Sequence, residues 1–122
     1  MIISFLVAGH YISFSPLRGD TGLRLSYEGL TLDLKIGQET VSTQWTEGLL
    51  MRTTTTITGE NKIRVRNIVE DIGVQETQDL LFKQNGLEVC KVMKLIFNEV
   101  TIQDSVFSEK LRGKGGQKGG VL

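Results

Sequence analysis

The sequence predicts an α+β fold: an antiparallel meander of five to six strands, followed by one or two C-terminal helices packed on the sheet. Two segments in which apolar and polar residues alternate, each folding back at a glycine-containing turn, predict the meander. A run of apolar residues at helical spacing, over residues 89–100, predicts the first helix. If that run is extended instead, the alternative is an all-β barrel or sandwich.

The first segment, residues 2–14, is expected to be a strand that is apolar on both faces, as in a buried or an intersubunit strand. Residues 8–11 could instead form a tight turn, which would make Ile2–Val7 and Ile12–Phe14 the two arms of a small hairpin. The loop that follows contains Arg18-Gly19-Asp20, the tripeptide of integrin ligands. These three residues are so common that the match alone assigns no function.

The clearest hairpin turns at Glu28-Gly29. Apolar residues alternate with polar ones on both sides of this turn: Leu23, Leu25 and Tyr27 before it, and Leu30, Leu32, Leu34 and Ile36 after it. A two-residue turn between two such segments predicts an antiparallel ribbon with one buried face. Residues 39–45, rich in Thr and Val, are expected to add a short strand.

Residues 50–58 and 62–69 predict a second hairpin, joined by residues 59–61. Strand alternation divides its side chains between two faces. One face would carry Thr53, Thr55, Ile57, Ile63, Val65 and Val69. The other, polar face would carry Arg52, Thr54, Thr56, Arg64 and Arg66.

Residues 74–85 are the most ambiguous part of the chain. Good helix formers and one favourable i, i+4 pair, Asp79 with Lys83, favour a helix. Asn85-Gly86 suits a helix C-cap as well as a hairpin turn. The sequence therefore leaves both helix and strand open for this segment.

Residues 87–100 predict a helix more clearly. Their apolar side chains form a continuous stripe at helical spacing: Val89, Val92, Met93, Ile96, Phe97 and Val100. A strand fits less well because it would place Lys91 and Glu99 among the apolar side chains of one face. Covering this stripe requires a sheet, either the chain's own or that of a partner.

Beyond the stripe, residues 100–107 form either a last strand or a second helix capped by Asp104, and we favour the helix. Residues 113–122 are rich in glycine and cannot pack a core, so they are expected to form a flexible basic tail. The chain thus divides into a single α+β domain, residues 1–112, and this tail.

The charges of the chain balance, but their distribution is uneven. The 122 residues include 14 basic and 14 acidic side chains. Four of the basic ones, Lys110, Arg112, Lys114 and Lys118, lie in the last thirteen residues, which contain no acid. Residues 1–109 therefore carry a net charge of −4, and residues 110–122, the tail and the three residues before it, carry +4, which makes this C-terminal segment a candidate for contact with a polyanion.

One histidine, His10, and one cysteine, Cys90, restrict the chemistry of the chain. Within one chain they exclude two-His metal sites and disulfides. No cofactor motif is present, so we expect no metal, no cofactor and no enzymatic activity. The N-terminal segment lacks the basic region of a signal peptide and is too short to span a bilayer, so we expect a location in the cytoplasm or within an assembled particle.

The predicted nucleic-acid surface combines the polar face of the second hairpin with the tail. Arginine binds phosphate in a bidentate manner, and threonine adds short-range donors. The residues expected to contact RNA or single-stranded DNA are Arg52, Thr54, Thr56, Arg64, Arg66, Lys110, Arg112, Lys114 and Lys118.

The function favoured by the sequence is a non-catalytic structural or interaction subunit that self-associates, because a small sheet and one amphipathic helix have limited means of covering their apolar faces alone. A symmetric homodimer would solve this burial problem. The element order is similar to that of pleckstrin-homology-like barrels and of the capsid subunits of single-stranded RNA phages, and the latter implies a virion-like subunit.

The alternative function is a small-molecule carrier, in which the meander closes around an apolar cavity. Such a cavity would be lined by Leu25, Tyr27, Leu32 and Trp45. An enzyme is the function least supported by the sequence.

Overall fold

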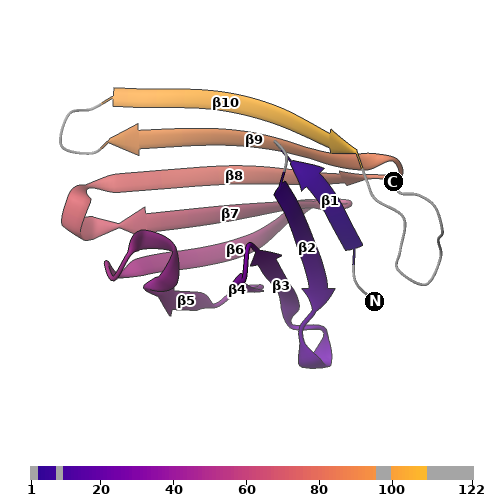
Figure 1. Ribbon diagram of the computed structural model, residues 1–122, viewed down its shortest axis with the longest axis horizontal. Helices are drawn as coiled ribbons and strands as arrows, with labels where there is room; N and C mark the ends of the chain where they lie inside the picture. The colour runs from indigo at the N-terminus through magenta and orange to yellow at the C-terminus, as the bar shows by residue number, and fades with distance from the viewer. Residues whose placement is uncertain (1–2, 8–9, 96–99, 110–122) are drawn as a thin grey trace.

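The computed structural model describes residues 3–7, 10–95 and 100–109, and these form ten strands in two antiparallel sheets (Figure 1). The four-stranded sheet has the order β1-β2-β3-β4 and consists of β1 (Ile3–Val7), β2 (His10–Pro16), β3 (Gly22–Tyr27) and β4 (Leu30–Lys35). The six-stranded sheet has the order β10-β9-β8-β7-β6-β5 and consists of β5 (Glu39–Ser42), β6 (Met51–Gly59), β7 (Lys62–Val69), β8 (Val74–Lys83), β9 (Gly86–Leu95) and β10 (Val100–Glu109). Short 3₁₀ turns lie in three of the connections: η1 (Arg18–Asp20), η2 (Gln44–Thr46) and η3 (Glu70–Ile72).

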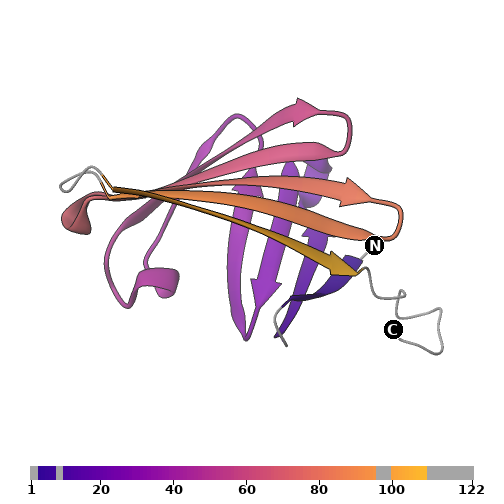
Figure 2. The ribbon, with the colours of Figure 1, turned by 90° about the horizontal axis from the view of Figure 1, so that it is seen from above.

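The two sheets face each other, and the strands of the smaller sheet cross those of the larger one steeply (Figure 1, Figure 2). The chain passes from one sheet to the other after β4, where the Gly37 amide donates to the Thr55 carbonyl at 3.0 Å. β1 and β10, which are edge strands of the two sheets, also lie against each other. The inner faces of the two sheets therefore bound a common interior.

Both predicted hairpins are present. Tyr27 pairs with Leu30 across Glu28 and Gly29, whose φ angles of 48° and 83° are those of a type I′ turn. In the second hairpin, β6 and β7, the predicted inner residues are buried: Thr53, Thr55, Ile63, Val65 and Val69. Ile57 is the exception, at 65% exposed, and it lies beside a register shift in the ladder between Ile57 and Gly59.

The N-terminal segment is a hairpin rather than one continuous strand, since β1 pairs with β2 from Ile3↔Phe14 to Val7↔His10. Of the short strand expected over residues 39–45, the first part is β5 and the last part lies in η2. The Arg18-Gly19-Asp20 tripeptide forms η1, in the connection between β2 and β3.

The predicted helices are absent from the described residues, so the α+β fold class is wrong and the architecture is all-β. Residues 74–83, left open by the sequence, form β8, which pairs with β7 and β9. Residues 86–95 and 100–109 form β9 and β10, so neither the helix over 89–100 nor the helix capped at Asp104 exists there. Among the described residues, no helix has the length and apolar character needed to cross a membrane.

Lys91 explains why the sequence favoured a helix over the strand that forms. A strand places Lys91 on the same face as Val89, and both side chains do line the interior between the sheets. The charge is tolerated there because Lys91 Nζ lies 3.5 Å from Glu76 Oε2 on the neighbouring strand. The alternation of polar and apolar residues therefore fails at the position where an inward charge has a partner.

One part of the interior is filled by an aromatic cluster. Phe14 packs against Phe82 with ring centroids 5.3 Å apart, and Phe5 lies 5.9 Å from Phe14 and 6.1 Å from Phe82. Phe5 and Phe14 are almost completely buried, as are Leu80 and Leu87 of the same core. These contacts join the two sheets.

Candidate ligand cavity between the sheets

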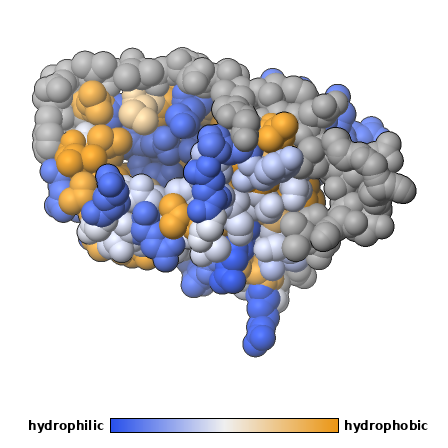
Figure 3. Space-filling view, in the orientation of Figure 1, coloured by the Kyte–Doolittle hydropathy of each residue, from blue (hydrophilic) through white to orange (hydrophobic). Residues whose placement is uncertain are grey.

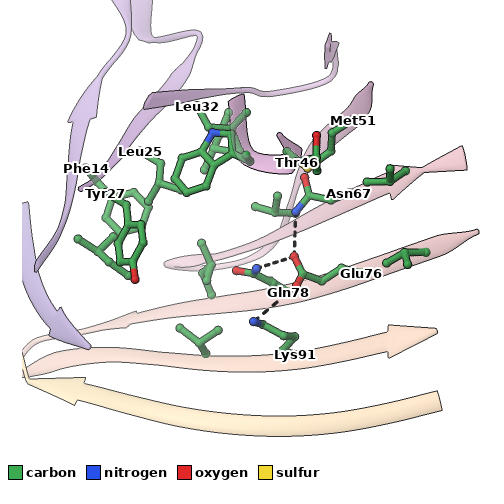
Figure 4. A pocket seen from close by; sticks show the side chains of 18 of the residues that line it. Phe14, Leu25, Tyr27, Leu32, Thr46, Met51, Asn67, Glu76, Gln78 and Lys91 are labelled. Carbon is green, nitrogen blue, oxygen red and sulfur yellow. Dashed lines mark hydrogen bonds and ion pairs between the residues drawn. The ribbon is translucent and has the colours of Figure 1, made fainter. Parts of the chain in front are cut away.

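A cavity of about 560 Å³ lies between the two sheets, beside the aromatic cluster. Its walls come from both sheets and from the connections at η2 and η3 (Figure 4). The four-stranded sheet contributes aliphatic and aromatic side chains: His10, Ile12, Phe14, Leu25, Tyr27, Leu32 and Leu34. The six-stranded sheet contributes apolar side chains together with four polar ones: Asn67, Glu76, Gln78 and Lys91.

The wall formed by the four-stranded sheet and η2 is apolar and aromatic. Tyr27 and Trp45 are stacked, with ring centroids 6.0 Å apart and an interplanar angle of 24°. The Trp45 indole N–H donates to the Thr31 carbonyl at 3.2 Å, so its polar atom is used within the chain. This hydrogen bond fixes η2 against β4 and leaves the indole ring as part of the cavity wall.

The wall formed by the six-stranded sheet carries a network of hydrogen bonds and one ion pair across β6, β7, β8 and β9. Thr53 Oγ1 donates to Asn67 Oδ1 at 2.6 Å, and Asn67 Nδ2 donates to Glu76 Oε1 at 3.1 Å. Gln78 Nε2 donates to the same Glu76 oxygen at 2.8 Å, while Lys91 Nζ lies 3.5 Å from the other, Oε2. Figure 4 shows Asn67, Glu76, Gln78 and Lys91 facing Tyr27 and Leu25 across the cavity.

The register of the strands produces this network. Thr53 is paired with Asn67, Asn67 with Glu76, and Gln78 with Lys91, so the polar residues stand opposite one another across neighbouring strands. Because side chains alternate along a strand, all of them point into the interior with Val65, Val69 and the other apolar lining residues.

Burial increases from the Lys91 end of the network towards Thr53. The Lys91 side chain is 42% exposed and that of Glu76 is 18% exposed, whereas Asn67 is 8% exposed and Thr53 only 1%. Asn67, itself bonded by the Thr53 hydroxyl, therefore holds Glu76 from the core side, and Lys91 is the most exposed member of the network. Figure 3 shows the molecule hollowed here, with hydrophilic side chains in the depth of the hollow and hydrophobic ones beside it.

His10 stands at the edge of the cavity. Its Nδ1 lies 2.5 Å from Glu28 Oε2, and its ring contacts Tyr27 edge-on with centroids 5.6 Å apart. Both members of the His10–Glu28 pair are about half exposed, so they contribute a polar rim rather than a buried charge.

The four residues that the carrier hypothesis required, Leu25, Tyr27, Leu32 and Trp45, all line the cavity. Sequence reasoning missed the polar residues of the opposite wall. Asn67 could have been found, because it lies between Val65 and Val69 at the spacing of an inner-face residue. Glu76, Gln78 and Lys91 could not, because their segments were assigned no strand register.

The predicted nucleic-acid residues of the second hairpin lie on the opposite, outer side of the six-stranded sheet. Two of the three arginines are ion-paired there. Arg52 donates to Glu39 at 3.1 Å and lies 3.8 Å from Glu70, and Arg64 binds Asp79. Thr54, Thr56 and Arg66 are exposed on the same face. The predicted C-terminal contact residues, Lys110, Arg112, Lys114 and Lys118, lie outside the described residues.

The Arg64–Asp79 pair is bidentate, with Arg64 Nε 2.8 Å from Asp79 Oδ1 and Nη2 3.2 Å from Oδ2. These hydrogen bonds lower the pKa of Asp79 below its ordinary value, against a smaller opposing effect of desolvation. Arg24 lowers the pKa of Asp33 in the same way on the four-stranded sheet. Both pairs lie on outer faces and stabilise the sheets rather than form part of the cavity.

The described residues include no group of three or more His, Cys, Asp or Glu side chains that could hold a metal ion. Comparison of the chain with protein-family models, with curated proteins and with solved structures found no match.

Proposed function

We propose that this protein binds a small amphipathic molecule in the cavity between its two sheets. A volume of about 560 Å³ is within the range of ligand sites, and the lining combines many apolar side chains with a few convergent polar groups. The apolar part of the ligand would lie against the Tyr27–Trp45 wall, and its polar part would face the network on β7, β8 and β9.

The observation that carries this proposal is the position of Glu76 and Lys91. An inner sheet face is stabilised most simply by aliphatic side chains, and taking an ion pair out of water costs free energy that the pair does not always recover. Here the pair stands on the inner face with two amide partners, at a place where the sheets are not packed together. Polar groups at such positions are typical of binding sites.

The test is binding of a neutral apolar dye, N-phenylnaphthylamine, whose emission rises in apolar surroundings. The wild-type protein is expected to bind the dye at one saturable site. Val89→Phe places a ring in the cavity, so it should weaken binding by about tenfold or more. Val92→Phe is the matched control, because Val92 lies on the same strand at an outward position.

The proposal fails if the wild-type protein does not bind the dye, or if the Val89 and Val92 variants bind it equally well. Circular dichroism and thermal melting of both variants show whether each is folded, and only folded variants are compared.

The outer face of β6 and β7 is the alternative site, for RNA or single-stranded DNA. It is less well supported, because Glu39, Glu70 and Asp79 lie beside Arg52 and Arg64 and reduce the local positive charge. Binding of an RNA oligomer that falls in the double variant Arg64→Ala, Arg66→Ala, with a smaller salt dependence, would favour this site. Equal binding of the RNA oligomer by the double variant and the wild type would rule out this face as the nucleic-acid site.

Self-association was expected because a helical stripe needed a covering sheet. In the structure the two sheets cover each other's inner faces, so this reason no longer applies. Light scattering at two ionic strengths, with and without the RNA oligomer, measures the subunit number directly.

A further inference from the structure

We infer that the ligand carries a hydroxyl group, which donates a hydrogen bond to the side-chain carbonyl oxygen of Gln78. This specifies the chemistry of the molecule that the cavity would take, so it rests on the proposed function. Three features of the site lead to it: the orientation of the Gln78 amide, the lack of a partner for its oxygen in the described part of the chain, and the polar atoms of the facing wall.

The orientation of the Gln78 amide follows from its bond to Glu76. Gln78 Nε2 donates to Glu76 Oε1 at 2.8 Å. An ionised carboxylate only accepts hydrogen bonds, so the NH₂ group must be turned towards Glu76 and the carbonyl oxygen away from it. Gln78 lines the cavity, and Figure 4 shows its oxygen on the side that faces Tyr27.

The carbonyl oxygen of Gln78 has no hydrogen-bond donor among the residues that the structure describes. Gln78 is half-buried, and this oxygen is not closed off inside the protein. A ligand that fills the cavity displaces the water from it, and leaving a buried acceptor unpaired costs free energy. The ligand is therefore expected to supply a donor.

Lys91 is the nearest cation to this oxygen along the ladder, since it is paired with Gln78 across β8 and β9. Its ammonium group, however, lies 3.5 Å from Glu76, and the register places a second acidic residue, Asp104, opposite it on β10. Lys91 is therefore given no contact with the ligand.

The facing wall also presents a polar atom to this space. The Trp45 indole N–H already has a backbone acceptor, and the His10 ring is held by Glu28. The Tyr27 hydroxyl has no hydrogen-bond partner among the described residues. Figure 4 shows it directed into the space between the two walls, as the Gln78 oxygen is. Both walls thus leave a polar atom for a ligand.

The Gln78 oxygen selects among the polar groups that a ligand could carry. Esters, ethers and hydrocarbons have no donor, and a carboxylate only accepts, so each of them would leave this oxygen unpaired. An ammonium group donates, but taking its charge out of water is costly. A hydroxyl group donates without a charge, and its own oxygen remains free to accept a hydrogen bond.

The experiment compares decanol with 1-methoxydecane, in which a methyl group replaces the hydroxyl hydrogen. Each displaces N-phenylnaphthylamine from the wild-type protein at neutral pH. Decanol is expected to do so at concentrations about threefold or more below those of the ether, although the ether has more apolar surface. Methyl decanoate, which also lacks a donor, and decylamine, which is a cation, should likewise require higher concentrations than decanol.

Gln78→Met tests the assignment of the acceptor, because it removes the carbonyl oxygen and keeps a side chain of similar size. In this variant the ether should bind as tightly as decanol or more tightly. Gln75→Met is the matched control: Gln75 lies at an outward position of the same strand, so this variant should keep the preference for decanol. The two ligands are compared within each variant, so a change in dye affinity cancels.

Dye binding and thermal melting show whether each variant is folded. If Gln78→Met is not, Gln78→Asn takes its place, because it keeps the amide but draws it back from the cavity by one methylene group. It should likewise abolish the preference for decanol.

The inference is overturned if the wild-type protein binds the ether, the ester or the amine more tightly than decanol, or if the folded Gln78 variant keeps the wild-type preference. These results would leave the proposed function in place, because a ligand would still occupy the cavity. If neither the dye nor any of the ligands binds, the proposed function itself fails and the inference falls with it.

Discussion

Glu76 on β8 and Lys91 on β9 form an ion pair on the inner face of the six-stranded sheet, with 3.5 Å between Oε2 and Nζ. The pair faces a cavity rather than a packed core, and two amide side chains donate to the other carboxylate oxygen of Glu76, Oε1. Inward charges of this kind are costly in a sheet whose role is only structural. The relationship between these two residues is thus the central feature of the proposed binding site.

Trp45 is expected to report ligand binding by its fluorescence. It is the single tryptophan of the chain, and it lines the cavity beside Tyr27. Methyl decanoate in contact with the indole should change the emission intensity and shift it to shorter wavelength, because water leaves the ring. Steady-state emission during titration measures this, and Val89→Phe should suppress the change. A full response in that variant would contradict the location of the ligand.

Thr53→Val should lower the free energy of unfolding by about 1–3 kcal/mol, because it leaves the Asn67 carbonyl oxygen without its buried donor. Thr53 is 1% exposed, so water cannot replace the lost hydroxyl. Urea denaturation measures the change. Thr54→Val, on the exposed outer face of the same strand, should change stability by no more than about 0.5 kcal/mol. Equal effects of the two substitutions would show that the inner network is not held as described.

Acidification should remove the stabilisation contributed by Arg64. The folded-state pKa of Asp79 lies below its ordinary value of 3.8 because Arg64 bonds the ionised carboxylate. Such a group stabilises the fold above its ordinary pKa, and the contribution is lost as the pH falls through the lowered folded-state value. Arg64→Met should therefore be less stable than the wild type near neutral pH and equally stable well below the lowered pKa.

Urea midpoints measured across this acid range test the pH dependence, with Arg66→Met as the control from the same face of β7. The control should differ from the wild type by the same small amount at every pH. A deficit of Arg64→Met that persists unchanged into strong acid would show that the pair does not act through ionised Asp79.

Gly22→Ala should be strongly destabilising, by about 2–4 kcal/mol, because the new methyl group would lie 2.0 Å from the Leu34 carbonyl oxygen. The backbone atoms of β3 and β4 would have to separate to accept it. Gly59→Ala is the control, since its methyl group would meet only the flexible Lys62 side chain, at 3.8 Å. Thermal melting of the two variants compares them, and a Gly22 variant that melts like the wild type would contradict the close approach of the two strands.

The sequence was sufficient to predict strands where the alternation of polar and apolar residues agreed with the turn residues. The Glu28-Gly29 turn and the alternation on either side of it predicted β3 and β4, and the same reasoning predicted the inner and outer faces of β6 and β7. It failed where inward positions hold polar side chains. Glu76 and Gln78 hid the strand period of β8, and Lys91 made β9 fit a helix better than a strand.

The cavity could be predicted only in part for the same reason. Leu25, Tyr27 and Leu32 belong to one clear hairpin, so their common face followed from the alternation. The polar wall depends on the pairing of Asn67 with Glu76 and of Gln78 with Lys91, which requires the register of three strands. No local pattern contains that information.

The most direct test is to locate a bound neutral ligand by NMR chemical-shift changes during titration with methyl decanoate. We predict that the largest changes occur at the Trp45 indole N–H and at the methyl groups of Val65 and Val89, which line the cavity. The outward residues Val92 and Thr54 should change little. Changes confined to the outer face of β6 and β7, or none at all at saturating ligand, would contradict the account.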